Sequence, residues 1–462
     1  MAQQEDGGAP PGRASTAGAR LWRAAADTLE ANWVGVATVP SATQYPHQWS
    51  WDSAFISIGW SVLDPARARV ELESLLAGQW SDGRLPHIQF NPAVPEQAYF
   101  PGPSFWASKA HPDGPAVATS GLVQPPVHAR AVLTAVQAGL GTGGTGRTGS
   151  KAALDFGRAA YPRLLAWHRY LRQRRDLGGD GLVALVHPWE SGLDNSPVWD
   201  APLAAVSRPG AAAFTRRDTL HVGAAERPTD RDYAAYVSLA TAYRDSGYDD
   251  RAAGGLEFVV ADPLVNAVLL DAELCLARLA ELLGLDPSGH SRAAHELHEA
   301  MLAGLYDADR GIFCARDLRT GRLLPAATLA GLLPLLDPWL SEEVRIRLLE
   351  RLVSPGFLGG ARFPVPSTAM DSPDFDRRRY WRGPTWICTN WLLALAAGTA
   401  GRGELAERIV RSGLDLVGGA GFREYFDPVD GTGLGAHEFS WSAALTLDWL
   451  AHPVGARPPR PG

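Results

Sequence analysis

Apolar residues recur every three or four positions along most of the chain, which is the spacing of amphipathic helices. The strict alternation that is typical of half-buried strands is nearly absent. The pattern predicts helices over residues 21–32, 55–63, 66–79, 127–138, 156–173, 233–243, 262–283, 291–305, 329–336, 341–352, 386–397, 404–416 and 440–450.

The segment 262–283 carries the clearest helix signals of the chain. Asp262 is placed to accept backbone hydrogen bonds at the start, Pro263 follows in the first turn, and Gly284 comes directly after the end. Cys275 lies inside this apolar run, so we expect it to be a small buried hydrophobe rather than a nucleophile.

About a dozen helices in consecutive pairs, joined alternately by short turns and long loops, predict an all-α fold. Six inner and six outer helices would form a toroid, an (α/α)6 barrel, with its long loops gathered at one mouth. A superhelical stack of repeats is the rival architecture, but the chain shows no self-similarity at a fixed period. We expect one domain over residues 21–452 with loop insertions at about 86–120, 139–151 and 207–230, a disordered N-terminal tail at 1–20 and a C-terminal tail at 453–462.

Composition excludes several classes of protein. The chain has 462 residues, of which 46% are hydrophobic, and a formal net charge of −7, without a stripe of lysine and arginine that would favour nucleic acid. It has no apolar run of about 18 residues for a membrane span, and its first twenty residues lack the apolar centre of a secretory signal. Three widely spaced cysteines argue against a disulfide framework, so we expect a cytoplasmic protein. The sequence leaves open whether it forms a homo-oligomer.

Aromatic residues gather in the glycine- and proline-rich loops. The chain has 16 tryptophans and 11 tyrosines, whose flat apolar faces and polar edges suit the apolar faces and hydroxyl rims of sugar rings. A large hydrophobic core would also contain many aromatics, but their position in the loops favours sugar binding.

Residues 187–200, HPWESGLDNSPVWD, place two carboxyl groups between tryptophans. An acid beside apolar rings has its pKa raised by desolvation, which a general acid requires near neutral pH. The plainer interpretation is that the tryptophans are core and that the acids cap helices. Hydrolysis of a glycosidic bond needs a second carboxylate, and Glu424, in the distant loop 421–431, could meet Asp194 only across the cavity of a toroid.

Other chemistries lack their sequence patterns. The histidines at 187, 221 and 437 do not have metal-ligand spacing, and we expect surface or supporting roles for them. The GTGGTG stretch follows no strand, so we interpret it as linker rather than a phosphate-binding loop. We therefore expect neither a cofactor nor a bound metal.

Several motifs in one order resemble glycoside hydrolase family 63, in its bacterial branch of glucosylglycerate and mannosylglycerate hydrolases. The motifs are QWSWD at 48–52, ESGLDNSP at 190–197, RPTDRDY at 227–233, DPLVNAVL at 262–269, YWRGPTW at 380–386, EYFDP at 424–428 and FSWSAA at 439–444.

The resemblance implies an (α/α)6 barrel and hydrolysis with inversion, with Asp194 as general acid and Glu424 as general base. It also implies a glycerate subsite and a glycosyl subsite. The first would contain Gln124, Arg227, Tyr233, Tyr380 and Trp381, and the second Tyr45, Trp49, Trp51, Asp52 and Trp386. To the substrate-binding set we add Tyr99, Glu190, Gly192 and Glu438.

Some of these residues have rival roles. Glu190 is a rival candidate for the acid, but with Asp194 in that role we expect it to orient the loop or to contact the sugar. Glu438 is a rival candidate for the base, and Asp52 is equally placed to cap a helix.

The predicted function is hydrolysis of glucosylglycerate, or mannosylglycerate, to the sugar and glycerate. The partner is then a small glycoside with a carboxylate aglycone, for which the fixed guanidinium of Arg227 is suited. The rival functions are an α-glucosidase or trehalase-like hydrolase of neutral disaccharides, and a sugar epimerase or non-catalytic sugar-binding protein on the same toroid.

Overall fold

Six segments form a closed inner ring in the computed structural model, which describes residues 16–141, 146–207, 215–251 and 255–452. Each inner segment packs against the next, and the last returns to the first. In ring order they are α2 (Ser50–Leu63), α5 (His128–Gly141), α9 (Pro263–Leu283), η6 (Leu329–Leu336), α12 (Ile387–Thr399) and α14 (Ser440–Ala451).

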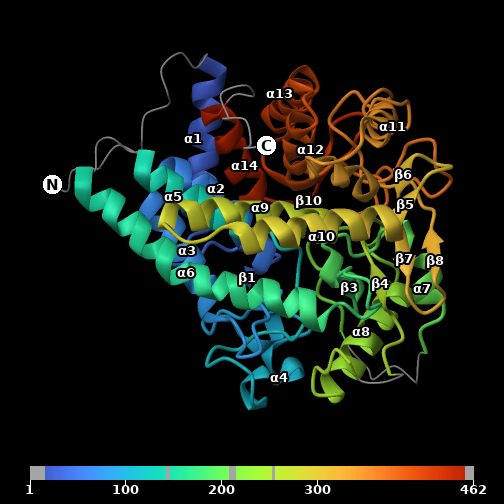
Figure 1. Ribbon diagram of the computed structural model, residues 1–462, viewed down its shortest axis with the longest axis horizontal. Coiled ribbons are helices and arrows are strands. Elements are labelled where there is room, and N and C mark those ends of the chain that lie inside the picture. Colours follow the sequence, from blue (N-terminus) through green and yellow to red (C-terminus); the bar gives the residue numbers. More distant parts are fainter. Residues whose placement is uncertain (1–15, 142–145, 208–214, 252–254, 453–462) are drawn as a thin grey trace.

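Each inner segment has an outer helix packed against it, as α9 and α10 show across the middle of Figure 1. The outer helices, in the same order of partners, are α3 (Pro65–Ala77), α6 (Gly146–Arg174), α10 (Ser288–Leu305), α11 (Glu342–Leu352), α13 (Gly403–Ala420) and α1 (Thr16–Ala31). The prediction of an (α/α)6 barrel is confirmed.

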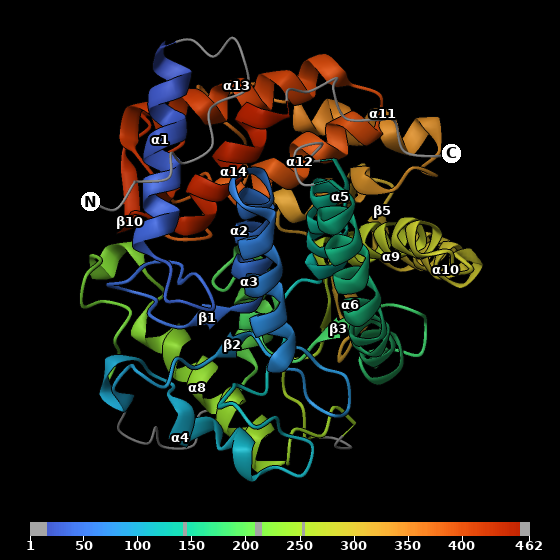
Figure 2. The same cartoon turned by 90° about the vertical axis from the view of Figure 1, so that its left-hand side faces the viewer.

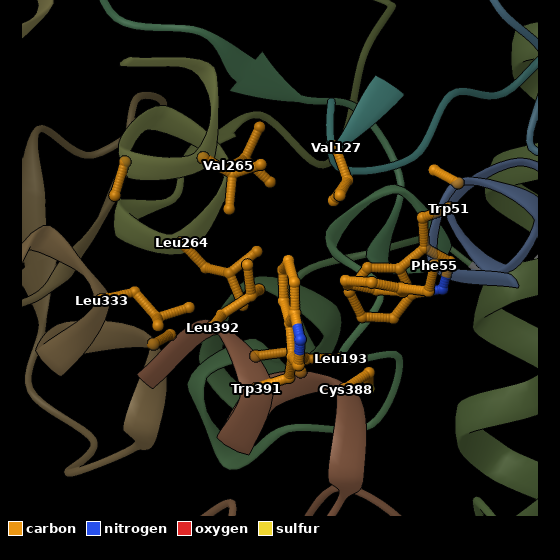
Figure 3. Packing of buried hydrophobic residues seen from close by; sticks show 14 of the residues in the cluster. Trp51, Phe55, Val127, Leu193, Leu264, Val265, Leu333, Cys388, Trp391 and Leu392 are labelled. Atoms are coloured by element: carbon orange, nitrogen blue, oxygen red, sulfur yellow. The ribbon is translucent and has the colours of Figure 1, made fainter. Parts of the chain in front are cut away.

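The difference between inner and outer helices follows from their side chains. Helix α9 buries residues around nearly its whole circumference, whereas α13 buries one apolar stripe and leaves the rest to solvent. The inner helices come very close: a Cβ on Gly59 of α2 would lie 2.5 Å from the Cα of Ala444 on α14. Side chains from several inner helices meet at the centre, where Figure 3 shows Phe55 and Trp391.

Helix α9 begins and ends where the sequence predicts. The Asp262 side chain accepts a hydrogen bond from the Val265 N–H, Pro263 is the first helical residue, and Gly284 ends the helix in the left-handed conformation. Cys275 is buried in this helix, as expected.

Short strands are the main feature that the pattern misses. β1 (Gln48–Trp49) pairs with β2 (Ile88–Gln89), β5 (Tyr306–Asp307) with β6 (Ile312–Phe313), and β9 (Arg423–Phe426) with β10 (Gly433–His437). A four-stranded sheet has the order β3 (Ala184–Leu185), β4 (Val260–Ala261), β7 (Ala315–Asp317), β8 (Arg322–Leu324). All these pairs are antiparallel. Segments of two to five residues are too short for alternation to stand out.

Three further predictions were wrong in part. The segment 329–336 is a 3-10 helix rather than an α-helix. The insert predicted at 139–151 is helical on both sides, since α5 continues to Gly141 and α6 begins at Gly146, while 142–145 lie outside the described residues. The tail predicted at 1–20 overlaps α1, which begins at Thr16; residues 1–15 and 453–462 lie outside the described part.

The connections from each outer helix to the next inner segment are long, and they carry the remaining elements. Figure 2 shows β1 and β2 beside the lower part of α3, with α8 (Asp230–Asp245) and α4 (Pro103–Trp106) lower in the same view. The helical elements in these long connections are η1 (Glu96–Ala98), α4 (Pro103–Trp106), η2 (Ser108–Ala110), η3 (Pro188–Ser191), η4 (Pro197–Trp199), α7 (Asp200–Ala204), η5 (Ala224–Glu226) and α8 (Asp230–Asp245). None of the helices in the described part combines the length and apolarity that crossing a bilayer requires.

Candidate active site

A pocket at the loop-bearing mouth brings together residues that are far apart in the chain. Both predicted catalytic carboxyl groups, Asp194 and Glu424, line it. The other predicted site residues that line it are Tyr45, Trp49, Trp51, Asp52, Tyr99, Gln124, Gly192, Tyr380 and Trp381. Five predicted residues lie outside this lining: Glu190, Arg227, Tyr233, Trp386 and Glu438.

Asp194 lies between η3 and η4, on a turn that requires glycine. Gly192 has a φ of +71°, and a Cβ there would lie 2.6 Å from the Trp51 ring. Burial raises the pKa of Asp194 to about 7, the Glu424 carboxylate adds to this rise, and the Arg227 guanidinium opposes it. The Tyr380 hydroxyl lies 3.5 Å from an Asp194 carboxyl oxygen. Asp194 is therefore able to hold a proton near neutral pH.

Glu190 lies under this turn rather than in the pocket. Its carboxylate accepts two hydrogen bonds of 2.7 Å from the Arg175 guanidinium, and both side chains are fully buried. It also accepts hydrogen bonds from the backbone N–H groups of Val123 and Val186. Of the two roles expected for Glu190, these contacts favour orientation of the loop that presents Asp194 over contact with the sugar.

Glu424 is on β9, where the hairpin with β10 holds its carboxylate. Oε1 accepts hydrogen bonds from the Tyr45 hydroxyl at 2.7 Å and from Arg227 Nη1 at 3.1 Å. Oε2 accepts from Arg227 Nη2 at 2.7 Å and from the Ala436 N–H at 2.8 Å. A Cβ on Gly435, whose φ is +66°, would lie 2.5 Å from Oε2, so this position requires glycine.

Arg227 is the cation of this arrangement. Its side chain is 2% exposed, and the guanidinium lies 4.7 Å from the centre of the Tyr380 ring. It is paired with Glu424 at the edge of the pocket.

Asp52 is the third carboxyl group in the pocket. Trp49, not Asp52, occupies the position that caps α2, and Asp52 lies in the first turn with 4% exposure. Burial raises its pKa well above the ordinary value, and the Glu424 and Asp194 carboxylates add to the rise. The Gln124 side chain accepts a hydrogen bond from the Trp51 N–H, which fixes the start of α2 against the pocket.

Aromatic rings form the wall beside Tyr380. The rings of Trp381 and Trp386 are stacked with centroids 3.7 Å apart and planes 6° from parallel. Trp386 is in turn stacked on Tyr425 at 4.6 Å, and its indole N–H donates to the Tyr380 carbonyl. Trp381 thus lines the pocket, while Trp386 supports it from behind.

Tyr233 and Glu438 also take positions that differ from the prediction. The Tyr233 hydroxyl donates to the Phe100 carbonyl and so ties α8 to the loop that carries Tyr99. Glu438 is exposed, and the backbone at this residue has a φ of +50°. Its carbonyl accepts a hydrogen bond from Asn32. Neither side chain lines the pocket in the conformation described.

Five pocket residues lie outside the predicted catalytic and substrate-binding set: Pro40, His87, Trp189, Phe439 and Trp441. Of these, Trp189 was expected only as an apolar wall beside the acids. Trp189, Phe439 and Trp441 lie in or beside motifs that were recognised, so those motifs could have indicated them. His87 has no such signal. Burial lowers its pKa to about 3, and its Nδ1 is hydrogen-bonded to the Ser120 hydroxyl.

The three histidines that were expected in surface or supporting positions are found in such positions. His187 is buried rather than on the surface, and its Nδ1 accepts a hydrogen bond from the Trp189 N–H. His221 and His437 are exposed. In the described ranges, no group of three or more histidine, cysteine, aspartate or glutamate side chains is arranged to hold a metal ion.

Residues 45–442 match the family described as the mannosylglycerate hydrolase MGH1-like glycoside hydrolase domain. A mannosylglycerate hydrolase from Thermus thermophilus is 41% identical over 435 residues, which is 92% of this chain and 99% of that protein. A glucosylglycerate hydrolase from Mycolicibacterium hassiacum is 36% identical over 436 residues, 92% of this chain and 96% of that protein.

Solved structures show the same fold. A crystal structure of a mannosylglycerate hydrolase of glycoside hydrolase family 63 from Thermus thermophilus, in complex with Tris and D-glycerate, superposes with a TM-score of 0.85 at 39% identity. The alignment covers 93% of this chain and 99% of that one. A neutral trehalase from Saccharomyces cerevisiae has a TM-score of 0.56 at 15% identity, covering 91% and 74% of the two chains, and shares the fold.

Proposed function

Because the chain belongs to the mannosylglycerate hydrolase MGH1-like family of glycoside hydrolases, we propose that it hydrolyses α-glycosides of glycerate with inversion. The glycosyl group is glucose or mannose, as in the named relatives. Asp194 is the general acid and Glu424 the general base in this proposal. A cytoplasmic location goes with it, since all three cysteines are buried free thiols.

The observation that carries the proposal is the pair of carboxyl groups in one pocket with unlike surroundings. Burial keeps Asp194 protonated up to about pH 7, whereas Glu424 is paired with the Arg227 guanidinium. Two carboxyl groups in unlike environments are what acid and base roles require.

In the proposed reaction, Asp194 donates its proton to the glycosidic oxygen as the bond to the anomeric carbon breaks. Glu424 accepts a proton from a water molecule whose oxygen attacks the anomeric carbon from the opposite face. The products are glycerate and the sugar in the inverted anomeric form. After one turnover Glu424 has gained a proton and Asp194 has lost one. Glu424 then releases its proton to solvent and Asp194 takes one up, which restores the enzyme.

The glycosyl group would lie among the aromatic rings at the start of α2, with Asp52 available for its hydroxyls. The glycerate carboxylate would be recognised by Arg227, since a guanidinium can bind both of its oxygens. Tyr380, Trp381 and Gln124 line the same pocket and complete the proposed subsite.

A release assay tests the proposal directly. Glucosylglycerate, mannosylglycerate, trehalose and maltose are offered in turn, and NMR identifies the anomer that is first released. We expect turnover of a glycosylglycerate and release of the β-anomer; preferential turnover of a neutral disaccharide would favour the trehalase-like alternative.

Variants test the two carboxyl roles. Asp194→Asn and Glu424→Gln should each lose about a hundredfold or more of kcat, the usual worth of a general acid or base. Asp200→Asn is the matched control, because that carboxylate lies six positions further on and pairs with Arg382 at the surface. Full activity in either catalytic variant would refute the assignment.

A further inference from the structure

The carboxylate of Glu424 has all of its acceptor positions filled. An ionised carboxylate offers about four lone-pair positions, two on each oxygen. In this structure Oε1 receives the Tyr45 hydroxyl and Arg227 Nη1, and Oε2 receives Arg227 Nη2 and the Ala436 N–H. Both Glu424 and Arg227 are buried, so solvent does not weaken these bonds.

A general base must accept a hydrogen bond from the water that it deprotonates. With four donors in place, the Glu424 carboxylate has no position left for that water, so one donor has to leave before the reaction. The Ala436 N–H belongs to β10 and is fixed by the hairpin. The two donors that side-chain rotation can withdraw are the Tyr45 hydroxyl and the Arg227 guanidinium.

The guanidinium needs another anion before it can leave Glu424, because an unpaired buried cation is costly. It is held against the rings of Tyr380, Tyr45 and Tyr425, at 4.7, 5.8 and 5.9 Å from their centres. Its Nε has no hydrogen-bond partner among the described residues, so the group has unused donor capacity. A carboxylate that entered the pocket could compensate the charge in place of Glu424.

We propose that the carboxylate of the aglycone forms an ion pair with Arg227 in place of Glu424, and that Glu424 is thereby freed to act as the base. This inference rests on the proposed function, in which Glu424 is the base and the aglycone is anionic. Arg227 is then a specificity-determining residue that acts on the rate of the chemical step. A neutral glycoside could occupy the glycosyl subsite, but it would leave Glu424 blocked.

This arrangement places selectivity in kcat rather than only in KM. Binding energy from the remote carboxylate is used to assemble the active base, which is selection by induced fit. The exchange is of ion pairs alone: Arg227 leaves one carboxylate for another, and no covalent bond changes.

The test uses a substrate whose aglycone is not a carboxylate, together with a carboxylate added separately. α-Glucosyl fluoride, or α-mannosyl fluoride if the manno epimer is preferred, is hydrolysed with and without acetate. Acetamide serves as the neutral isostere, and sodium chloride equalises ionic strength. Acetate should raise kcat for the fluoride about tenfold or more, within the usual range of coupling between two ligands, whereas acetamide and chloride should not.

Variants identify the residue responsible. Arg227→Gln should hydrolyse the fluoride at a rate that acetate no longer changes. The matched control is Arg378→Gln, because Arg378 is a cation on a neighbouring loop, 56% exposed and 3.7 Å from Glu226. That variant should keep the full acetate response.

The outcomes separate this inference from the function on which it rests. If acetate leaves kcat for the fluoride unchanged in the wild-type enzyme, base release is refuted, even where glycosylglycerates are hydrolysed well. If the enzyme hydrolyses no glycosylglycerate, the proposed function itself fails. The wild-type measurement decides without the variant, should Arg227→Gln not fold.

Discussion

Replacing Asp194 by asparagine should lower kcat about a hundredfold or more and, at the same time, stabilise the fold at alkaline pH. The carboxyl group has an ordinary pKa of 3.8, and burial raises it to about 7 in the folded chain. Between these values the unfolded chain has released the proton while the folded chain keeps it, so the free energy of unfolding falls as pH rises. Asparagine has no proton to lose and escapes this penalty.

The two pKa values set the size of the effect. A difference of about 3 units, at 1.36 kcal/mol each, amounts to about 4 kcal/mol, reached above pH 7 and absent below pH 4. Between pH 5 and pH 8, the advantage of Asp194→Asn over the wild type should therefore grow by about 3 kcal/mol.

Urea unfolding of both proteins at pH 5 and pH 8, followed by fluorescence, measures this growth. Asp200→Asn is the control: its carboxylate is 54% exposed, and that variant should gain no comparable advantage at pH 8. If the advantage of Asp194→Asn is the same at both pH values, burial does not hold Asp194 protonated, and the reasoning that makes it the acid fails.

Three further predictions concern the same site. For a glycosylglycerate, kcat should fall as pH rises through about 7, because Asp194 then loses the proton it donates. The pH–rate profile of the glycosyl fluoride should show no such fall, because its leaving group needs no proton. Glu190→Gln removes one of the two buried carboxylates that pair with Arg175, Asp250 being the other, and should lower the free energy of unfolding by about 1–3 kcal/mol in urea titrations. Gly435→Ala introduces a Cβ 2.5 Å from a Glu424 oxygen and should lower kcat about tenfold or more, with a smaller change in KM, in steady-state assays.

Two substitutions serve as controls for these measurements. Glu438→Gln changes an exposed glutamate and should alter stability by less than about 0.5 kcal/mol. Gly401→Ala changes a glycine of similar φ, +72°, that has open space around it, so any effect on kcat should be small. Equal losses in a test variant and its control would contradict the contact assigned to the test residue.

The helices were predictable because each inner or outer segment has its own local signal. Asp262, Pro263 and Gly284 mark both ends of α9 within the sequence itself. The ring order is not local, but alternation of short and long connections was sufficient to indicate it. The glycine-rich stretch around 139–151 misled because helical context overrode the weak helix propensity of glycine at Gly141 and Gly146.

The presence of Asp194 and Glu424 in one pocket was predictable, because each of them lies in a motif of its own. It was not predictable where a role depends on a partner elsewhere. Glu190 resembles a second acid beside Asp194, and only the fold shows that Arg175, at the start of the same connection, neutralises it. Nor does the sequence distinguish Trp381, which faces the pocket, from Trp386 behind it.

The closed ring has a consequence for the order in which the chain becomes an enzyme. Helix α14, near the end of the chain, packs against α1 and α2 near its beginning, and Tyr45 from the first connection bonds Glu424 from the last. During synthesis the acid-bearing segment leaves the ribosome more than two hundred residues before the base. Contacts between the two ends are slow to form because they close the longest loop in the chain. Catalytic activity should therefore appear only when the ring closes. A nascent chain that stops before α14 would be partly folded and inactive.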